Sequence, residues 1–307
     1  MRTQPVQTVL ITGASTGIGL AIVRALSQIE CRVFVTARQS SLSRFASHGI
    51  GESSRLRLRP LDVTKPEERE AVIAEAERDC GGVDVLINNA GLSYRAVVEH
   101  VEEQDRIGQM DVNFRSPMEL IRLVLPTMRA KQAGRIITIS SVGGMMAMPT
   151  MGAYSASKFA LEGAHEALWY EVRPWGVRVS LVQPGFVDSD GFQKVRYTPE
   201  SSRSKRNHDD PYHEHYVNMA PFVAQLMKWS VATPESVAKV VLKTMRRRRP
   251  PLRVPATLDA WGFSLLRRML PRNLYHGLLY RMLPQIDTWG PSPKRRSSLR
   301  APRDAPD

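Results

Sequence analysis

Short apolar runs recur along this chain and alternate with amphipathic stretches whose apolar residues have helical spacing. The runs are Thr8–Ile11, Arg32–Thr36, Arg57–Leu61, Val83–Ile87, Arg135–Ser140 and Arg178–Gln183, and the amphipathic stretches include Ala21–Ile29 and Ala71–Arg78. Strands that are apolar on both faces and alternate with helices indicate a parallel sheet with helices on each side. We therefore predict an α/β fold with a doubly wound parallel sheet. Composition does not change over the first ~230 residues, which favours a single domain.

A glycine-rich loop, Thr12–Gly19, directly follows the first apolar run. A strand that turns sharply into a helix exposes unpaired N–H groups and the positive end of the helix dipole, which together stabilise a pyrophosphate. Glycines let the chain turn tightly and let the phosphate approach the backbone. A plain tight turn is the alternative, but the flanking strand and helix favour a dinucleotide site. We predict that it is formed by Gly13, Ser15, Thr16, Gly17, Ile18 and Gly19.

The end of the second run indicates which dinucleotide is preferred. A carboxylate at this position would bind the free hydroxyls of the adenine ribose and repel a 2′-phosphate. The chain has Ala37 here, followed by Arg38. Because a guanidinium binds phosphate well, Arg38 favours NADP(H), with NAD(H) as the weaker alternative.

The third and fourth runs also end in polar or small residues. Asp62 and Val63 end the third run; the Asp62 carboxylate could accept from the adenine amino group or could fix a turn. The fourth run ends in Asn88–Gly91, where Asn88 is interpreted as structural. The residues predicted to line the cofactor here are Asp62, Val63, Asn89, Ala90 and Gly91.

Tyr154 and Lys158 are four residues apart, so on a helix they project from one face. A nearby ammonium favours the phenolate and is expected to lower the pKa of the tyrosine toward the working range. The phenol can then exchange a proton with a carbonyl or alcohol oxygen. Ser141, just after the fifth run, would donate to the same oxygen, and Ser140 is its rival for this role.

At these motifs the chain resembles the classical short-chain dehydrogenase/reductase (SDR) family, which has a Rossmann fold. The resemblance is close over about residues 6–190. It matches Thr12–Gly19 and Asn88–Gly91 to family motifs, and it implies a catalytic tetrad of Asn113, Ser141, Tyr154 and Lys158. By this resemblance Asn113 holds a water that relays protons to Lys158, and Lys158 also binds the nicotinamide ribose. It further implies a cofactor-contacting turn of Pro184, Gly185, Val187 and Ser189.

Within the family, Ser141–Met148, Tyr154–Gly163 and Pro250–Pro271 resemble the 17β-hydroxysteroid and retinol dehydrogenase branch. The resemblance implies an apolar substrate, such as a steroid, a retinoid or another lipid. The residues expected to form an apolar pocket wall are Met145, Met146, Met148, Val187 and Phe192, although methionines also serve as core filler. The family also implies a homodimer or homotetramer formed through helices at Glu102–Lys131 and Tyr154–Arg173.

The later part of the chain differs in character. We predict a catalytic domain over residues 1–255, with an irregular substrate lid or disordered loop at 188–222. Residues 256–290 are expected to form helices that cover the core and substrate mouth or lie on a membrane surface. Residues 291–307 are rich in Pro, Ser and Arg and predict a disordered tail.

Composition limits the remaining possibilities. The net charge is +13, but no nucleic-acid motif accompanies it, so nucleic acid is not an expected partner. Cys31 and Cys80 have no metal-ligand spacing, and no metal is expected. With no room for a signal peptide before the first strand, we expect a cytoplasmic enzyme, compatible with membrane contact through its basic C-terminal region. The leading hypothesis is an NADP(H)-dependent carbonyl reductase or alcohol dehydrogenase; a ketoreductase of secondary metabolism and a catalytically silent cofactor-binding regulator are the alternatives.

Overall fold

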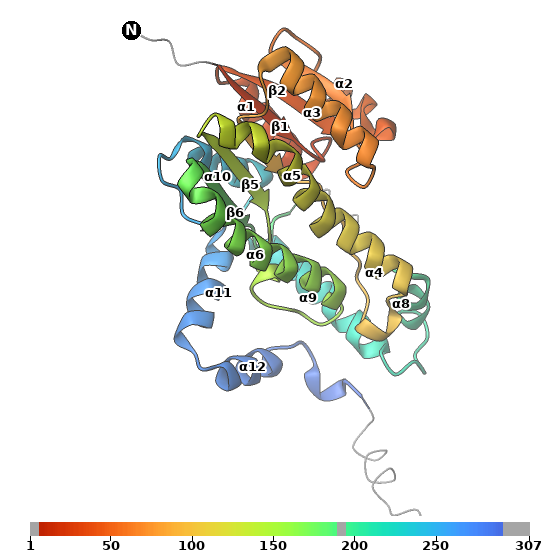
Figure 1. Cartoon of the computed structure of the whole chain (residues 1–307). Coiled ribbons are helices and arrows are strands. Elements are labelled where there is room, and N and C mark those ends of the chain that lie inside the picture. The colour runs from red at the N-terminus through yellow and green to blue at the C-terminus, as the bar shows by residue number, and fades with distance from the viewer. Residues whose placement is uncertain (1–5, 189–194, 291–307) are drawn as a thin grey trace, which may run out of the picture.

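A seven-stranded parallel sheet with the order β3-β2-β1-β4-β5-β6-β7 forms the centre of the molecule (Figure 1). The computed structural model describes residues 6–188 and 195–290, except the side chains of Arg272 and Asn273. The strands are β1 (Gln7–Ile11), β2 (Cys31–Ala37), β3 (Leu56–Pro60), β4 (Val85–Asn88), β5 (Gly134–Ile139), β6 (Val177–Gln183) and β7 (Arg253–Pro255). The predicted doubly wound parallel sheet is confirmed.

Helices cover both faces of the sheet: α1 and α10 pack on one face, and α3, α5 and α6 pack on the other (Figure 1). The helices are α1 (Gly17–Ser27), α2 (Ser43–Ser47), α3 (Pro66–Cys80), α4 (Glu103–Met110), α5 (Ser116–Ala130), α6 (Gly152–Val172), α8 (Pro199–Ser204), α9 (His213–Trp229), α10 (Pro234–Arg246), α11 (Leu258–Met269) and α12 (Arg272–Arg281). A π-helical turn, Asp111–Arg115, joins α4 to α5.

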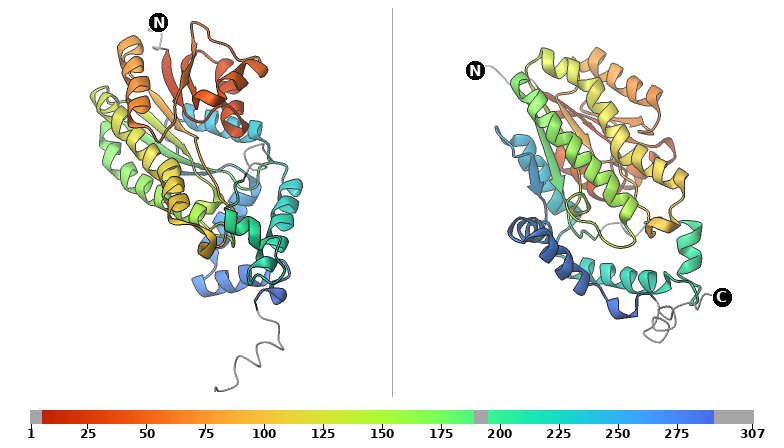
Figure 2. Two further views of the ribbon diagram at one scale, coloured as in Figure 1. Left: turned by 90° about the vertical axis from the view of Figure 1, so that its right-hand side faces the viewer. Right: turned by 60° about the horizontal axis from the view of Figure 1, so that its bottom comes forward.

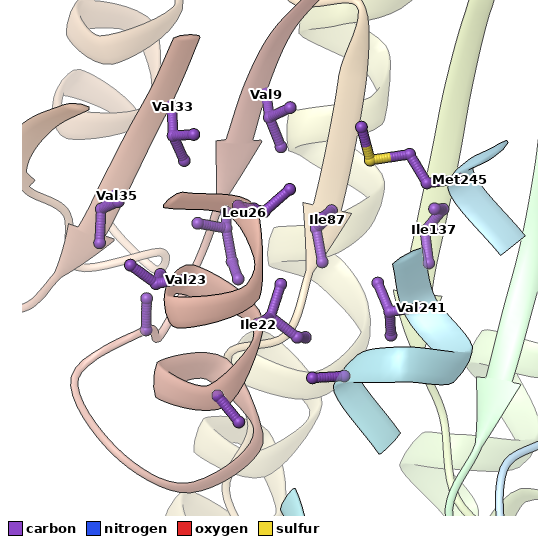
Figure 3. Packing of buried hydrophobic residues seen from close by; sticks show 14 of the residues in the cluster. Val9, Ile22, Val23, Leu26, Val33, Val35, Ile87, Ile137, Val241 and Met245 are labelled. Atoms are coloured by element: carbon purple, nitrogen blue, oxygen red, sulfur yellow. The ribbon is translucent and has the colours of Figure 1, made fainter. Parts of the chain in front are cut away.

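Alternate residues of each strand supply the two cores. In β1, Val9 and Ile11 face the core under α1 and α10, whereas Leu10 faces the core under α5. Figure 3 shows Val9 beside Leu26 of α1, with Val241 of α10 completing this layer. Each buried aliphatic side chain stabilises the folded state by roughly 1.5–3 kcal/mol. Together these two layers hold the strand ends in fixed positions.

The six strands anticipated in the sequence form within two residues of their expected limits, but β7 was not anticipated. β7 is a three-residue edge strand that pairs with β6 through Leu181, Val182 and Gln183. Its flanking prolines and short length give it no periodic signal. It nevertheless places Arg253 beside α6, where that residue contacts Glu162.

Helix α3 begins at Pro66, and the preceding Thr64 does not cap it. Because proline takes the first helical position, Lys65 becomes the N-cap, and the Thr64 hydroxyl donates instead to Asp62 Oδ1 at 2.7 Å. Helix α10, in contrast, begins with a capping box at Thr233. Thr233 Oγ1 accepts from the N–H of Ser236, and Ser236 Oγ accepts from the N–H of Thr233.

The segment expected to be an irregular lid, residues 188–222, is partly helical. It contains α8 and most of α9, and residues 189–194 lie outside the described part of the chain. α9 buries Tyr216, Met219 and Val223, which recur at helical spacing. Pro221 and the neighbouring histidines concealed that period in the sequence.

The helices expected after residue 255 are present as α11 and α12 (Figure 1). They contribute few buried side chains, among them Ala260 and Tyr275. Within residues 6–188 and 195–290, we find no helix with the length and apolar character needed to span a membrane.

Candidate active site

A cavity of about 520 Å³ opens at the carboxyl edge of the sheet. Strand ends in a doubly wound sheet form such a crevice where the strand order reverses, here between β1 and β4. Most of the residues predicted from the sequence line this cavity: Gly13, Ser15, Thr16, Gly17, Ile18, Gly19, Arg38, Asp62, Val63, Asn89, Ala90, Gly91, Ser141, Tyr154, Lys158, Pro184, Gly185 and Val187. Asn113 lies outside the lining, and Ser189 lies outside the described residues.

The glycine loop is packed too closely for side chains. A Cβ on Gly13 would lie 2.7 Å from the Cα of Ala90, and Gly13 has a φ of +63°. A Cβ on Gly19 would lie 2.6 Å from the Gly13 carbonyl oxygen. Asn89, directly after β4, fixes this loop, because its Nδ2 donates to the carbonyls of Thr12 and Gly13 at 3.0 and 2.9 Å.

Thr12 is a structural residue of this loop that the sequence reasoning missed. Its hydroxyl accepts from the backbone N–H groups of Asn89 and Ala90 at 3.0 and 3.1 Å, and so ties β1 to β4. The available signal was a polar residue directly after an apolar run.

The N-terminus of α1 is available to an anion. Thr16 is the N-cap of α1, but its side chain makes no capping hydrogen bond within the described part of the chain. The first turn of the helix also carries no acidic residue. The first N–H groups of α1 and its dipole therefore face the cavity. This uncapped helix, with glycines where a Cβ would fill the space, fits the pyrophosphate of a dinucleotide.

The far end of the cavity is basic. Arg38 lines it together with Arg44 of α2, which the sequence reasoning missed. Asp62 accepts from the backbone N–H and hydroxyl of Thr64 at 3.0 and 2.7 Å, which is the turn role considered for it. Burial works to raise the pKa of Asp62, but the Thr64 hydrogen bonds and the charge of Arg38 outweigh it and hold the pKa below its usual range.

Tyr154 and Lys158 both face the cavity from the first turns of α6, opposite Ser141. Ser141 follows β5, and its hydroxyl accepts from the N–H of Gly143 at 3.0 Å. Ser140 also touches the cavity, but its hydroxyl donates to Glu162 at 2.6 Å. Because the Ser140 hydroxyl is already used, the geometry favours Ser141 over its rival.

The protonation of Tyr154 differs from expectation. Burial raises the pKa of its phenol above the usual value, and a hydrogen bond with Ser141 opposes the rise only in part. The Lys158 ammonium lies 5.9 Å from the Tyr154 ring centre, and its Nζ donates to the carbonyl of Ile139 at 2.9 Å. The expected lowering by Lys158 is therefore wrong for this structure, in which Tyr154 is a neutral phenol at pH 7.

Lys158 is itself perturbed. Burial lowers the pKa of its amine to about 8, although the negative charge of Glu162 favours the ammonium form. Glu162 lies one helical turn beyond Lys158 on α6 and is buried. An amine with a pKa near 8 can both donate hydrogen bonds and exchange a proton at physiological pH.

Glu162 is a third residue that the sequence reasoning missed, after Thr12 and Arg44. Its carboxylate accepts from Ser140 Oγ at 2.6 Å, Gln183 Nε2 at 2.9 Å and Arg253 Nε at 2.8 Å. These contacts join α6 to β5, β6 and β7 directly behind the cavity. A Tyr-x-x-x-Lys-x-x-x-Glu spacing could have suggested it, because four-residue steps keep all three side chains on one helix face.

Asn113 lies in the π-helical turn and is buried. Its Nδ2 donates to the Leu92 carbonyl and to Ser157 Oγ at 2.8 and 2.9 Å, and its Oδ1 accepts from the N–H of Leu92 at 2.8 Å. Ser157 in turn donates to the carbonyl of Tyr154. Asn113 thus connects the loop after β4 to the backbone that carries Tyr154 and Lys158.

The opposite side of the cavity is apolar. Of the expected wall residues, Met146, Met148 and Val187 line it, Met145 lies outside the lining, and Phe192 lies outside the described residues. Side chains not anticipated from the sequence complete the wall, namely Met151, Phe186, Val223 and Met227. The cavity therefore joins a polar, phosphate-compatible half to an apolar half, with Tyr154 and Ser141 between them.

Comparisons with known proteins agree with this geometry. Residues 7–200 match the family model described as short chain dehydrogenase. The chain is 34% identical over 269 residues to 3-ketodihydrosphingosine reductase from Bacteroides thetaiotaomicron, covering 87% of this chain and 94% of that protein. It is also 34% identical to human 17-beta-hydroxysteroid dehydrogenase type 1, covering 80% and 76%.

Among solved structures, a short-chain dehydrogenase from Streptomyces avermitilis superimposes with a TM-score of 0.72 at 28% identity, covering 90% of this chain and 99% of that one. The matched residues include the glycine loop and the elements that carry Ser141, Tyr154 and Lys158. The chain therefore belongs to the short-chain dehydrogenase/reductase family and is an oxidoreductase that acts on alcohol and carbonyl groups.

Proposed function

We propose that the protein is an NADP(H)-dependent oxidoreductase that interconverts a ketone or aldehyde with an alcohol on an apolar substrate. The observation that carries the proposal is that the phosphate-compatible loop, Ser141, Tyr154 and Lys158 all line the same cavity of about 520 Å³. A phenol, a hydroxyl and an ammonium beside a dinucleotide site form the constellation that carbonyl reduction requires.

The proposed roles follow from the geometry. A bound nicotinamide supplies the hydride that carbonyl reduction requires. Tyr154, kept neutral by burial, donates its proton to the carbonyl oxygen. Ser141 donates to the same oxygen and stabilises its developing negative charge. Lys158 would hold the nicotinamide ribose and return a proton toward Tyr154, and Asn113 positions α6 through Ser157.

Preference for NADP(H) is supported by Arg38 and Arg44, two guanidinium groups at the adenine end of the cavity. β2 ends in Ala37, so the usual ribose-binding carboxylate is replaced by a methyl group. A 2′-phosphate placed there would gain charge-assisted hydrogen bonds. NAD(H) would gain none of these, so we expect a lower KM for NADPH than for NADH.

An apolar substrate is supported by the wall of Met146, Met148, Phe186 and Val223. The flexible methionines suit a steroid-, retinoid- or lipid-like molecule. The names of the similar enzymes, a 3-ketodihydrosphingosine reductase and a hydroxysteroid dehydrogenase, lie within this class. A ketoreductase of secondary metabolism would use the same chemistry with a more polar substrate.

The wider organisation is also proposed. We assign residues 1–255 to cofactor binding and catalysis, 188–222 to the substrate lid and 256–290 to a helical extension. A homodimer or homotetramer through α5 and α6 and a cytoplasmic location with peripheral membrane contact complete the proposal. Light scattering of the purified chain tests the proposed oligomer. A monomer at micromolar concentration would contradict the proposed homodimer or homotetramer.

The decisive experiment compares the wild type with a Tyr154→Phe variant. Nicotinamide absorbance is followed during a screen of steroid ketones, retinals, long-chain 3-keto bases and aromatic ketones. We expect NADPH-dependent reduction of an apolar ketone, with kcat falling by about 10²–10⁴ when the phenol is removed. If NADPH binds but the wild type reduces none of these classes, the silent-regulator alternative stands. Turnover that survives the substitution would remove Tyr154 from the mechanism.

A further inference from the structure

Helix α11 turns an apolar stripe away from the protein. Leu258, Trp261 and Met269 are 79%, 60% and 71% exposed, and Leu265 is also exposed. These four residues are spaced at i, i+3, i+7 and i+11, so they lie along one side of the helix. A surface helix of a globular protein normally directs such a stripe toward the core.

Helix α12 repeats the arrangement. Leu274 and Leu278 are exposed one turn apart, and Met282 follows one turn later with 59% of its surface exposed. Arg281 is exposed on the same side. Because single exposed apolar residues are common but a continuous set is not, two successive helices with outward apolar stripes indicate an interaction surface. We define residues 258–282 as the C-terminal surface.

The charge of the C-terminal surface has one sign. Its sequence contains Arg267, Arg268, Arg272 and Arg281 against one acid, Asp259. Asp259 is used internally, since its carboxylate accepts from the N–H of Phe186 at 2.7 Å. Apolar side chains that include an exposed tryptophan, interspersed with arginines, are the composition of a helix that lies at an anionic lipid surface.

The inner side of the same helices contacts the substrate half of the cavity. Phe263 of α11 and Leu283 after α12 pack against the cluster that contains Val223 and Met227 of α9. Val223 and Met227 also line the cavity. Figure 2 shows α11 and α12 (blue) alongside α9 (teal), away from the sheet. The inner side of α11 therefore packs directly against the cluster that contributes residues to the apolar wall.

We propose that the C-terminal surface docks on an anionic lipid bilayer, so that an apolar substrate passes from the lipid to the cavity alongside α9. Docking depends only on the exposed stripes and their arginines. Substrate passage rests in addition on the proposed function. The bilayer is favoured over a second copy of the chain because a copy would bring a like-charged surface against these arginines.

Docking is tested with the full chain and vesicles of phosphatidylcholine, with and without phosphatidylserine. The variant combines Trp261→Glu, Leu265→Glu and Leu278→Glu, none of which lines the cavity. Its matched control is Trp175→Glu, which alters a tryptophan that is 46% exposed outside the C-terminal surface. We expect the wild type and control to co-sediment with anionic vesicles, more strongly at low salt. The triple variant should bind at least about tenfold more weakly, a loss of ~1.4 kcal/mol.

Equal binding by the triple variant, or no binding of the wild type to anionic vesicles, would overturn the docking proposal. So would conversion of a wild-type oligomer into monomers by the triple substitution, which would assign the surface to a second copy. For substrate passage, the triple variant should lose activity on a ketone embedded in vesicles but keep its activity on a short, water-soluble ketone. A wild type that binds vesicles and reduces no ketone would leave docking intact and remove the proposed function.

Discussion

Lys158 is a buried amine whose protonation depends on its neighbours. Burial favours the neutral amine, whereas Glu162 favours the ammonium, and the resulting pKa is about 8. His165, one turn beyond Glu162, adds no positive charge at pH 7, because burial lowers its pKa to about 4. Arg253 partly neutralises Glu162, and Glu166 shares that arginine. Glu162 is therefore the acidic group placed to set the proton affinity of Lys158.

A Glu162→Gln variant should shift the pH profile of carbonyl reduction. Loss of the negative charge lowers the pKa of Lys158 further, since burial is then less opposed. In the proposed mechanism, reduction needs the protonated pair of Tyr154 and Lys158, so activity should fall as pH rises through their apparent pKa. We expect the alkaline limb of kcat/KM to move to lower pH by about one unit.

The matched control is Glu166→Gln, which removes the other partner of Arg253 from a position that is 46% exposed. Its profile should stay within experimental error of the wild type. A uniform loss of kcat by Glu162→Gln without a shift of the limb would mean that Glu162 has only a structural role.

At this scale the sequence indicated Tyr154 and Lys158 from their spacing and Ser141 from its position after an apolar run, and all three line one cavity. Spacing could not choose between Ser140 and Ser141, since that choice depends on the contact of Ser140 with Glu162. Nor could it give the direction of the Tyr154 pKa, because burial is a property of the folded chain. Arg44 was missed because its approach to the cavity depends on the course of α2.

At the scale of elements, the start of α10 is fixed by reciprocal hydrogen bonds between Thr233 and Ser236. α10 packs against α1 in the core that supports the glycine loop, with Val241 fully buried (Figure 3). Replacement of Thr233 by Ala leaves an N–H at the helix start unpaired. We expect it to lower the free energy of unfolding by about 1 kcal/mol, as measured by urea denaturation.

Thr233→Ser retains an oxygen at the cap and serves as the control, with a change of only a few tenths of a kcal/mol. If the alanine variant proved as stable as the serine variant, the cap would contribute nothing to α10.

Comparison of Thr233 with Thr64 shows how far the sequence predicts where a helix begins. Both segments carry Thr and Pro before a helix, but Pro234 directly follows Thr233, whereas Lys65 separates Thr64 from Pro66. The proline therefore decided which residue became the N-cap. The long central strands were predictable because they are apolar on both faces, but β7 was not, since its pairing with β6 comes only from tertiary contact.

At the scale of the whole molecule, the cavity draws on segments from residue 13 to residue 227. The parallel topology could be predicted, and it explains why these distant segments meet at one edge of the sheet. The outward stripes of α11 and α12 could not be assigned from periodicity, because an apolar stripe is the same in sequence whether it faces a core or a membrane. A ligand that spans β1, β2 and β4 should stabilise the fold as a unit.

Thermal unfolding should therefore report the cofactor preference independently of turnover. A cofactor at a hundred times its Kd adds ~2.7 kcal/mol to the stability of the folded state, which raises Tm by roughly 4 °C for a chain of this size. NADPH should reach that rise at a lower concentration than NADH, because Arg38 and Arg44 are the groups that we propose bind the 2′-phosphate. In an Arg38→Ala/Arg44→Ala variant the two cofactors should become equal, while Arg24→Ala, an exposed arginine of α1, should behave as the wild type. Equal stabilisation of the wild type by NADH and NADPH would mean that these arginines do not select the 2′-phosphate. The proposed preference for NADP(H) would then be wrong, although the dinucleotide site itself would remain.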